Sequence, residues 1–258
     1  MPRHQKSTFH FKQFAVNQDK CAMKVGTDSI LLGAWVRVPE KGRVLDIGTG
    51  TGLLALMLAQ RSRSALIDAV EIDDFAYAQA LENVHNSPWG DRLKVYHSSI
   101  QDFAKDNFDA LPVTEHQNYQ YDLIISNPPF FEKSYKAPYQ ARTLARHSDS
   151  LLQSDILQIA QKLLKPSGLL AVVYPTDLAN MFMSKAEAFN LFGDRKLYVK
   201  PNLQNSVKRI LLELKKELKK ELKKDRHLLQ ESQITIEESK HIYTADYIAL
   251  VKDFYLNM

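Results

Sequence analysis

A strand, a glycine turn and a helix follow one another at residues 43–59, and they constrain the fold of this chain more than any other feature. Residues 43–47 predict a short strand, and residues 53–59 predict a helix. Alternate glycines in the turn between them leave room for a ligand beside the unpaired amides at the start of the helix. This order is typical of nucleotide-type binding turns in α/β folds.

The residues of the turn favour a ligand with a cationic portion. The turn reads Asp46-Ile47-Gly48-Thr49-Gly50-Thr51-Gly52. The dinucleotide fingerprint Gly-x-Gly-x-x-Gly would instead need its last glycine at Leu53. The carboxylate of Asp46 would repel a pyrophosphate and attract a positive charge. Taken alone, the turn does not identify the ligand.

Strands and helices alternate along the rest of the chain. Further strands are expected over residues 65–72, 93–96, 121–126, 169–174, 196–199 and 207–214. One helix is expected to start near residue 29, capped by Thr27 or Asp28, and another to start after a cap at Asp73 or Asp74. Further helices are expected over residues 154–164, 177–189 and 245–254. This alternation predicts an α/β fold with a mostly parallel sheet and right-handed crossovers.

Composition is consistent with one large domain. The chain has 258 residues, 45% of them hydrophobic, and a formal net charge of +4, which allows a nucleic-acid partner without requiring one. The single cysteine, Cys21, excludes a disulfide framework and a multi-cysteine zinc site. No signal peptide and no membrane-spanning run is recognisable, so we expect a cytoplasmic protein without a membrane partner.

A second motif, Asn127-Pro128-Pro129-Phe130, directly follows the strand expected at residues 121–126. Two consecutive prolines end the strand and form a rigid corner. There, Asn127 can accept a hydrogen bond from an amine, and Phe130 can cover the face of a planar group. The alternative is an ordinary turn from strand to loop.

Three other stretches carry candidate binding residues. Glu71 ends the second strand about twenty residues after the glycine turn, where an acid meets ribose hydroxyls in nucleotide-binding folds. The polar loop from Ser98 to Phe103 lies where an adenine could be read, although an exposed loop explains it equally well. The long basic and aromatic connection at 131–147 suits a substrate-facing lid that contacts phosphates.

The two ends of the chain also carry charge. The N-terminal residues 1–26 mix cations with phenylalanines, which suits RNA or solvated charge around core anchors. The repeat Glu-Leu-Lys-Lys at 213–225 favours a helix, whereas residues 209–214 before it favour a strand. We expect a charged projection there that returns to the sheet at 233–236, with most of its charge solvated.

The glycine turn, Glu71 and the Asn-Pro-Pro-Phe corner resemble the class I S-adenosylmethionine-dependent methyltransferases that modify exocyclic amines. The stretches 11–35 and 243–258 resemble a narrower group, the bacterial N6-adenine methyltransferases that act on adenine 37 of a valine tRNA. The resemblance covers nearly the whole chain. It implies a Rossmann-like, mostly parallel seven-stranded sheet with one antiparallel strand and helices on both faces.

The same resemblance implies the partners and the domain organisation. S-adenosyl-L-methionine is the expected cofactor and tRNA the expected partner, with no metal and a monomeric chain. Residues 1–40 would be an N-terminal extension that forms a cofactor lid and offers RNA contacts. Residues 41–258 would be the methyltransferase domain, with a charged insertion near 213–231.

The resemblance also assigns the site residues. The catalytic residues would be Asn127, Pro128, Pro129 and Phe130. The cofactor would contact Lys24, Thr27, Asp46, Gly48, Gly50, Gly52, Glu71, Ile72, Ser99, Ile100 and Asn127. From the basic and aromatic residues of the stretches 1–26 and 131–147, rather than from the resemblance, we expect the substrate to contact Lys12, Tyr139, Arg142, Arg146 and His147. Many relatives carry an acid at the position of Ser99 and a tyrosine at that of Phe130.

Two alternative functions stay open at this point. A methyltransferase for a glutamine side chain would present the same planar amide to the Asn-Pro-Pro corner. An inactive RNA adaptor that binds the cofactor is the second alternative, against which the intact Asp46, Glu71 and Asn127 argue.

Overall fold

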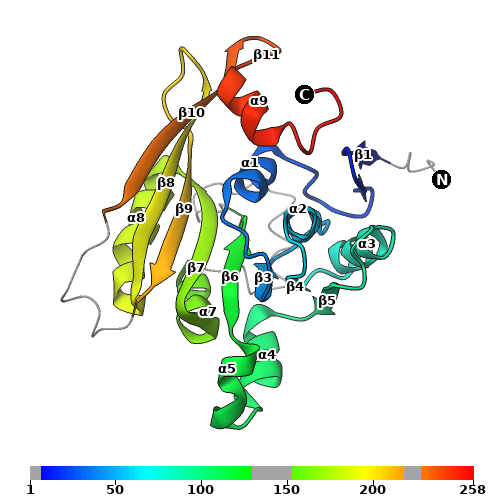
Figure 1. Ribbon diagram of the computed structural model, residues 1–258, viewed down its shortest axis with the longest axis vertical. Coiled ribbons are helices and arrows are strands. Elements are labelled where there is room, and N and C mark those ends of the chain that lie inside the picture. Colours follow the sequence, from blue (N-terminus) through cyan, green and yellow to red (C-terminus); the bar gives the residue numbers. More distant parts are fainter. Residues whose placement is uncertain (1–6, 130–152, 218–227) are drawn as a thin grey trace, which may run out of the picture.

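The computed structural model describes residues 7–129, 153–217 and 228–258, which form one central sheet with helices on both faces (Figure 1). The strands are β1 Thr8–His10, β2 Ala15–Asn17, β3 Arg43–Ile47, β4 Leu66–Glu71, β5 Leu93–His97, β6 Tyr121–Ser126, β7 Leu164–Pro175, β8 Leu191–Asn202, β9 Arg209–Lys216, β10 Gln230–Ser239 and β11 Ile242–Tyr243. The helices are α1 Thr27–Trp35, α2 Leu53–Arg61, α3 Asp74–His85, α4 Ile100–Ala104, α5 His116–Tyr119, α7 Gln153–Leu163, α8 Thr176–Ala186 and α9 Ala245–Val251. Short π- and 3₁₀-helical turns lie at Lys105–Asp109, Val113–Glu115 and Glu187–Phe189.

The described sheet has the order β11-β10-β8-β9-β7-β6-β3-β4-β5. The neighbours from β5 to β7 are parallel, and β9 lies antiparallel between β7 and β8. The predicted mostly parallel sheet with an antiparallel strand is therefore confirmed. The expected number of seven strands is too low, because β10 adds a parallel strand to β8 and β11 folds back on β10. Ile234 of β10 is 6% exposed, so the added strand enlarges the core.

Buried apolar side chains on both faces of the sheet explain the apolar strand sequences. Leu123 and Ile125 of β6 face the cluster formed with α1, α2 and α9, whereas Ile124 between them faces the cluster formed with α4, α7 and α8. Since side chains alternate across a strand, a strand covered by helices on both faces is apolar at consecutive positions. The sheet is thus the middle layer of three.

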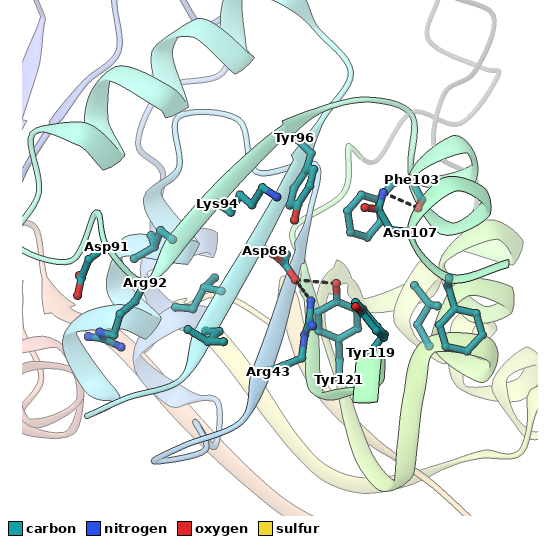
Figure 2. Close-up of a pocket in the computed structure, with 15 residues that line it drawn as sticks. Arg43, Asp68, Asp91, Arg92, Lys94, Tyr96, Phe103, Asn107, Tyr119 and Tyr121 are labelled. Atoms are coloured by element: carbon teal, nitrogen blue, oxygen red, sulfur yellow. Dashed lines mark hydrogen bonds and ion pairs between the residues drawn. The ribbon is translucent and has the colours of Figure 1, made fainter. Parts of the chain in front are cut away.

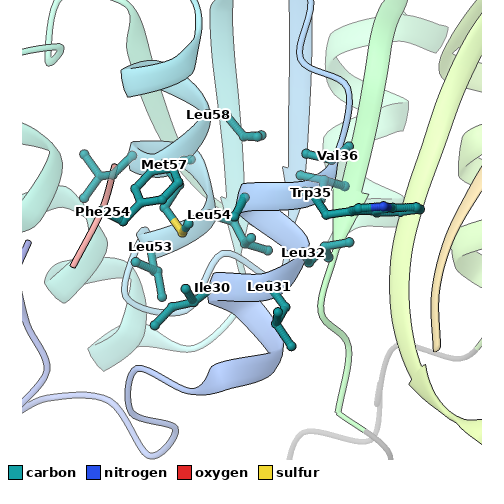
Figure 3. Packing of buried hydrophobic residues seen from close by; sticks show 14 of the residues in the cluster. Ile30, Leu31, Leu32, Trp35, Val36, Leu53, Leu54, Met57, Leu58 and Phe254 are labelled. Carbon is teal, nitrogen blue, oxygen red and sulfur yellow. The ribbon is translucent and has the colours of Figure 1, made fainter. Parts of the chain in front are cut away.

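The helix after the glycine turn lies deep in the first of these clusters (Figure 3). Residues 53–59 of α2 are all buried, as expected for a helix that is apolar all round. Gly33 allows α1 to approach α2 closely, because a Cβ atom there would lie 2.8 Å from the Met57 sulfur. The glycine turn is therefore attached to one of the most firmly packed helices.

The two ends of the described chain meet beside this core. Phe11 pairs with Tyr255, and the backbone amide of Lys12 donates to the carbonyl of Phe254 at 2.8 Å. The side chains of Phe11, Phe14 and Phe254 are buried in the same cluster as α1 and α2. Residues 11–36, which lie within the N-terminal extension expected over residues 1–40, thus contribute directly to this core.

No helix within residues 7–129, 153–217 and 228–258 is long and apolar enough to cross a membrane.

Candidate functional site

The carboxyl ends of the parallel strands bring the candidate residues to one edge of the sheet. The glycine turn follows β3, Glu71 ends β4, Ser99 lies just beyond β5, and Asn127 follows β6. Strands β4, β3 and β6 are neighbours in the sheet, with β5 next to β4. In open α/β sheets this edge is where ligands bind.

The three glycines of the turn adopt a backbone conformation that other residues rarely adopt. Gly48, Gly50 and Gly52 have φ values of 69°, 59° and 82°. A Cβ atom at Gly48 or Gly50 would meet no heavy atom within 4 Å among the described residues, so the turn is open on that side. A Cβ atom at Gly52 would instead lie 3.5 Å from Ala80 of α3. The turn is therefore a cradle with one open side and one side packed on α3.

Asp46 is fully buried below this cradle. Its Oδ2 atom accepts a hydrogen bond from the Thr49 hydroxyl at 2.6 Å, whereas Oδ1 is buried and has no partner in the described part of the chain. Burial, and to a smaller extent the charge of Glu71, raises the pKa of Asp46 to about 7, although the Thr49 hydroxyl and the Ala55 amide act in the opposite direction. A ligand that brings a cation or an N–H donor would stabilise the charged carboxylate.

Glu71 ties the glycine turn to the end of β4. Its Oε2 atom accepts from the Gly50 amide at 2.8 Å, and Oε1 accepts from the Ile72 and Asp73 amides at 2.9 and 3.0 Å. A carboxylate has about four acceptor positions, so roughly one remains for a ligand hydroxyl. Glu71 is 8% exposed, and its position suits the recognition of a ribose.

The residues expected near an adenine have different surroundings. Ile72 is 46% exposed and offers an apolar surface beside Glu71, whereas Ile100 is buried in the core. The hydroxyl of Ser99 caps α4 by accepting from the Asp102 amide at 3.0 Å and donates to the Asp102 carboxylate at 2.6 Å. The contact of Ser99 with a cofactor remains a prediction, and its capping bonds give it a structural role.

The Asn-Pro-Pro corner is held from two sides. The Asn127 amide nitrogen donates to the hydroxyl of Ser29 in α1 at 2.8 Å, and the Ser126 hydroxyl donates to the Ile47 carbonyl at 2.8 Å. The Asn127 Oδ1 atom is buried, and none of the described residues donates a hydrogen bond to it. Pro128 is buried and Pro129 is exposed. Asn127 thus presents an unused acceptor at the edge where the glycine turn lies.

The other predicted residues lie further out or outside the described ranges. Lys24 and Thr27 are exposed before and at the start of α1. The residue that caps this helix is Gly26, so the expected cap at Thr27 or Asp28 is wrong; Asp28 instead pairs with Arg209 at 2.8 Å. Phe130, Tyr139, Arg142, Arg146 and His147 lie outside the described residues.

Lys12, expected to contact the substrate, joins the two ends of the chain. Its ammonium group donates to the Lys252 carbonyl at 2.6 Å and to the Met258 carbonyl at 2.9 Å. These bonds fix the C-terminal segment after α9 against the N-terminal segment. The side chain is exposed, so an RNA contact of Lys12 stays a prediction.

Two buried amides of α3, Gln79 and Asn83, connect the N-terminal segment to the site and were missed from the sequence. Gln79 accepts from the Lys20 amide at 3.1 Å, and Asn83 bonds both Asn17 and Thr51. The spacing along the helix could have indicated their burial, because Gln79 and Asn83 lie on the same helical face as the buried alanines. Polar residues on a core-facing stripe indicate partners elsewhere in the chain.

A cavity of about 490 Å³ lies at the opposite edge of the sheet, at the amino ends of β3 to β6 (Figure 2). At its wall, the Asp68 carboxylate accepts from Arg43 at 2.6 Å and from the Tyr121 hydroxyl at 2.8 Å. The ring of Tyr119 lies under the same Arg43 guanidinium. This cavity does not include the glycine turn or Asn127, so it is separate from the candidate site.

The described residues contain no group of three or more histidine, cysteine, aspartate or glutamate side chains that could hold a metal ion.

Comparison with known proteins identifies the class of protein. Residues 21–190 match the methyltransferase small domain family, which spans more than half of the chain. The structure is similar to that of a predicted O-methyltransferase from Agrobacterium tumefaciens, with a TM-score of 0.59 and 14% identity over 88% of this chain and 96% of that chain. The chain therefore belongs to the methyltransferase small domain family, and its fold is that of class I methyltransferases.

Relatives with higher sequence identity show to which narrower family the chain belongs. The tRNA1(Val) (adenine(37)-N6)-methyltransferase of Trichodesmium erythraeum is 52% identical over 250 residues, covering 96% of this chain and 97% of its own length. The protein of the same name from Flavobacterium psychrophilum is 42% identical over 251 residues, covering 97% of this chain and 100% of its own. The chain belongs to the family of these proteins.

Proposed function

We propose that the chain transfers a methyl group from S-adenosyl-L-methionine to the exocyclic N6 of adenine 37 in a valine tRNA, as a cytoplasmic monomer. The observation that carries the proposal is the buried Oδ1 of Asn127, which has no partner among the described residues and lies at the same sheet edge as the open glycine cradle. The activity for which relatives that match nearly the full chain are named supports the choice of acceptor.

The residues of the turn fit the proposed cofactor. Its ammonium and sulfonium charges suit the Oδ1 of Asp46, to which no described residue donates a hydrogen bond, and its ribose hydroxyls suit the remaining acceptor position of Glu71. The open side of Gly48 and Gly50 leaves space for its amino-acid portion. When bound, the cofactor supplies an electrophilic methyl group on sulfur.

The residues of the corner would orient the amine that attacks this methyl group. Asn127 Oδ1 would accept one N–H of the adenine amine and the Pro128 carbonyl would accept the other, which directs the nitrogen lone pair to the methyl group. Orientation of this kind can contribute on the order of 7–11 kcal/mol to lowering a barrier. By the resemblance of the sequence, Phe130 would stack on the base, which is worth roughly 1–3 kcal/mol.

Incubation with labelled S-adenosyl-L-methionine and total tRNA, followed by nucleoside analysis, tests the proposal. We expect label in N6-methyladenine. Label found only in glutamine of added protein would favour the glutamine methyltransferase instead, and an absence of any labelled product would refute methyl transfer.

The variant Asn127→Ala tests the proposed contact with the amine. It should abolish turnover while the Kd of S-adenosyl-L-methionine, measured by calorimetry, stays near that of the wild type. Asn180→Ala, on the exposed side of α8, is the matched control and should retain full activity. Substantial activity in the Asn127→Ala variant would contradict the amine contact.

A further inference from the structure

Asn83 lies between residues 17–25, here called the N-terminal segment, and the glycine turn. Its side-chain oxygen and nitrogen both form hydrogen bonds with the backbone of these two segments. Its Oδ1 atom accepts from the Asn17 amide at 2.9 Å, and its Nδ2 atom donates to the Asn17 carbonyl at 2.8 Å. The second Nδ2 hydrogen goes to the Thr51 carbonyl at 2.8 Å. Asn83 is only 1% exposed, so water does not replace these bonds.

The side chain of Asn83 makes the hydrogen bonds to β2 that a neighbouring strand would make. It pairs with both the N–H and the C=O of Asn17, as an adjacent strand would, and joins β2 to α3 where Figure 1 shows the N-terminal strands beside that helix. Only one orientation of the amide satisfies all three bonds. The flipped amide would place its NH₂ against the Asn17 N–H and its oxygen against two carbonyls. The contact therefore fixes both segments relative to α3.

Neighbouring contacts attach the N-terminal segment to the same face of α3. The Lys20 amide donates to the side chain of Gln79 at 3.1 Å, and the Lys20 ammonium pairs with Glu82 at 2.6 Å. The Val25 amide donates to the side chain of Gln18 at 2.8 Å, which folds the segment back on itself. Residues 17–25 are thus attached to α3 at several points and continue into the start of α1.

On the other side, Asn83 holds the turn that forms the cradle. Thr51 is 6% exposed and lies between Gly50 and Gly52, whose conformations open the cradle. Gly52 lies against Ala80, one helical turn before Asn83. A displaced Thr51 carbonyl would shift the amide that Gly50 donates to Glu71.

From these contacts we infer that Asn83 is a positioning residue for cofactor binding, which couples residues 17–25 to the glycine turn so that both move as one unit. The inference rests on the proposed function, because it takes S-adenosyl-L-methionine as the ligand of the turn. The three hydrogen bonds of Asn83 all go to the protein backbone, so it would act on the ligand through the turn. Its loss should weaken cofactor binding, while the corner at Asn127, which it does not touch, keeps its role in transfer.

The test compares Asn83→Asp and Asn83→Ala with wild type and with Asn86→Ala, an exposed asparagine at the end of the same helix. Asn83→Asp keeps the shape and the bond from the Asn17 amide but places a charge against two carbonyls. We expect the Kd for S-adenosyl-L-methionine to rise on the order of 10-fold in both Asn83 variants, and kcat at saturating cofactor to change less than about 3-fold. Asn86→Ala should leave both unchanged.

Hydrogen exchange provides a readout that general destabilisation would not reproduce. In wild type, S-adenosyl-L-methionine should slow amide exchange in both residues 48–52 and residues 17–25. In folded Asn83→Asp, saturating cofactor should protect residues 48–52 alone, because the coupling is lost.

Several outcomes separate this inference from the proposed function. A Kd within 2-fold of wild type in the folded Asn83→Asp variant, or equal protection of both segments in it, would overturn the positioning role. Wild type that binds the cofactor without methylating tRNA would overturn the proposed function and leave the role of Asn83 standing. Wild type that fails to bind the cofactor would overturn both.

Discussion

Replacing Asp46 by asparagine should make the stability of the ligand-free protein less dependent on pH. Burial raises the pKa of the Asp46 carboxyl from 3.8 to about 7, so the folded protein holds a proton there that the unfolded chain releases. The stabilisation from this group is fully present below about pH 4 and is lost as the pH rises through about 7. A pKa displaced this far corresponds to about 4 kcal/mol, at roughly 1.4 kcal/mol for each pH unit. Asparagine has the same shape and no charge to bury.

Urea unfolding of wild type and Asp46→Asn from pH 4 to pH 8 measures this difference. The free energy of unfolding of the variant, minus that of wild type, should increase by about 4 kcal/mol over the range, most of it below pH 7. Other titrating groups cancel in the subtraction. Asp91→Asn, which makes the same substitution at an exposed aspartate, is the control. A flat difference for Asp46→Asn would refute the assignment of a protonated, buried carboxyl to this position.

Two further changes test contacts on which the site or the sheet depends. Ser29→Ala removes the acceptor of the Asn127 amide and should lower kcat roughly 2- to 10-fold in methyl-transfer assays, with an unchanged cofactor Kd. Ser29→Thr keeps a hydroxyl and should retain more activity. Equal rates for wild type and both variants would contradict the role of this contact. Glu213→Ala leaves the guanidinium groups of Arg37 and Arg195 without their buried partner and should lower the free energy of unfolding by roughly 3 kcal/mol in urea titrations. The control Glu238→Ala, at an exposed position, should lower it by less than about 0.5 kcal/mol. A loss below about 1 kcal/mol for Glu213→Ala would show that these ion pairs are dispensable for stability.

The helix α3 shows where the sequence predicts correctly and where it does not. Asp73 caps this helix as predicted, because the bonds to the amides of Phe75 and Ala76 are local. The apolar residues Ala76, Ala80, Leu81 and Val84 predict the buried face of this helix, but Leu81 is 45% exposed, whereas Asn83 is buried. Burial of an amide is favourable only when its partners are in place, and those of Asn83 come from distant segments. Helical periodicity therefore predicts the burial of Ala76, Ala80 and Val84 correctly and that of Leu81 wrongly.

The added strands have a similar explanation. The prediction that the chain returns to the sheet at 233–236 is confirmed, because these residues lie within β10. The strand itself is longer, from Gln230 to Ser239, since its pairing with β8 supplies backbone bonds to residues without strong strand propensity. Local propensity cannot account for bonds made to a strand formed some thirty-five residues earlier.

The candidate site combines two kinds of features, and only one kind can be recognised in a sequence. The open glycine turn and the proline corner depend on backbone conformations that glycine and proline set locally. The sequence therefore predicts the end of β3, the start of α2 and the end of β6 at the observed residues, whereas Phe130 of the corner lies outside the described residues. The orientation of the polar side chains depends on contacts across the chain: 98 residues separate Ser29 from Asn127, and 66 separate Asn17 from Asn83. Substitutions at Ser29 and Asn83 therefore test whether these contacts between distant segments determine how well the glycine turn and the proline corner bind and orient the reactants.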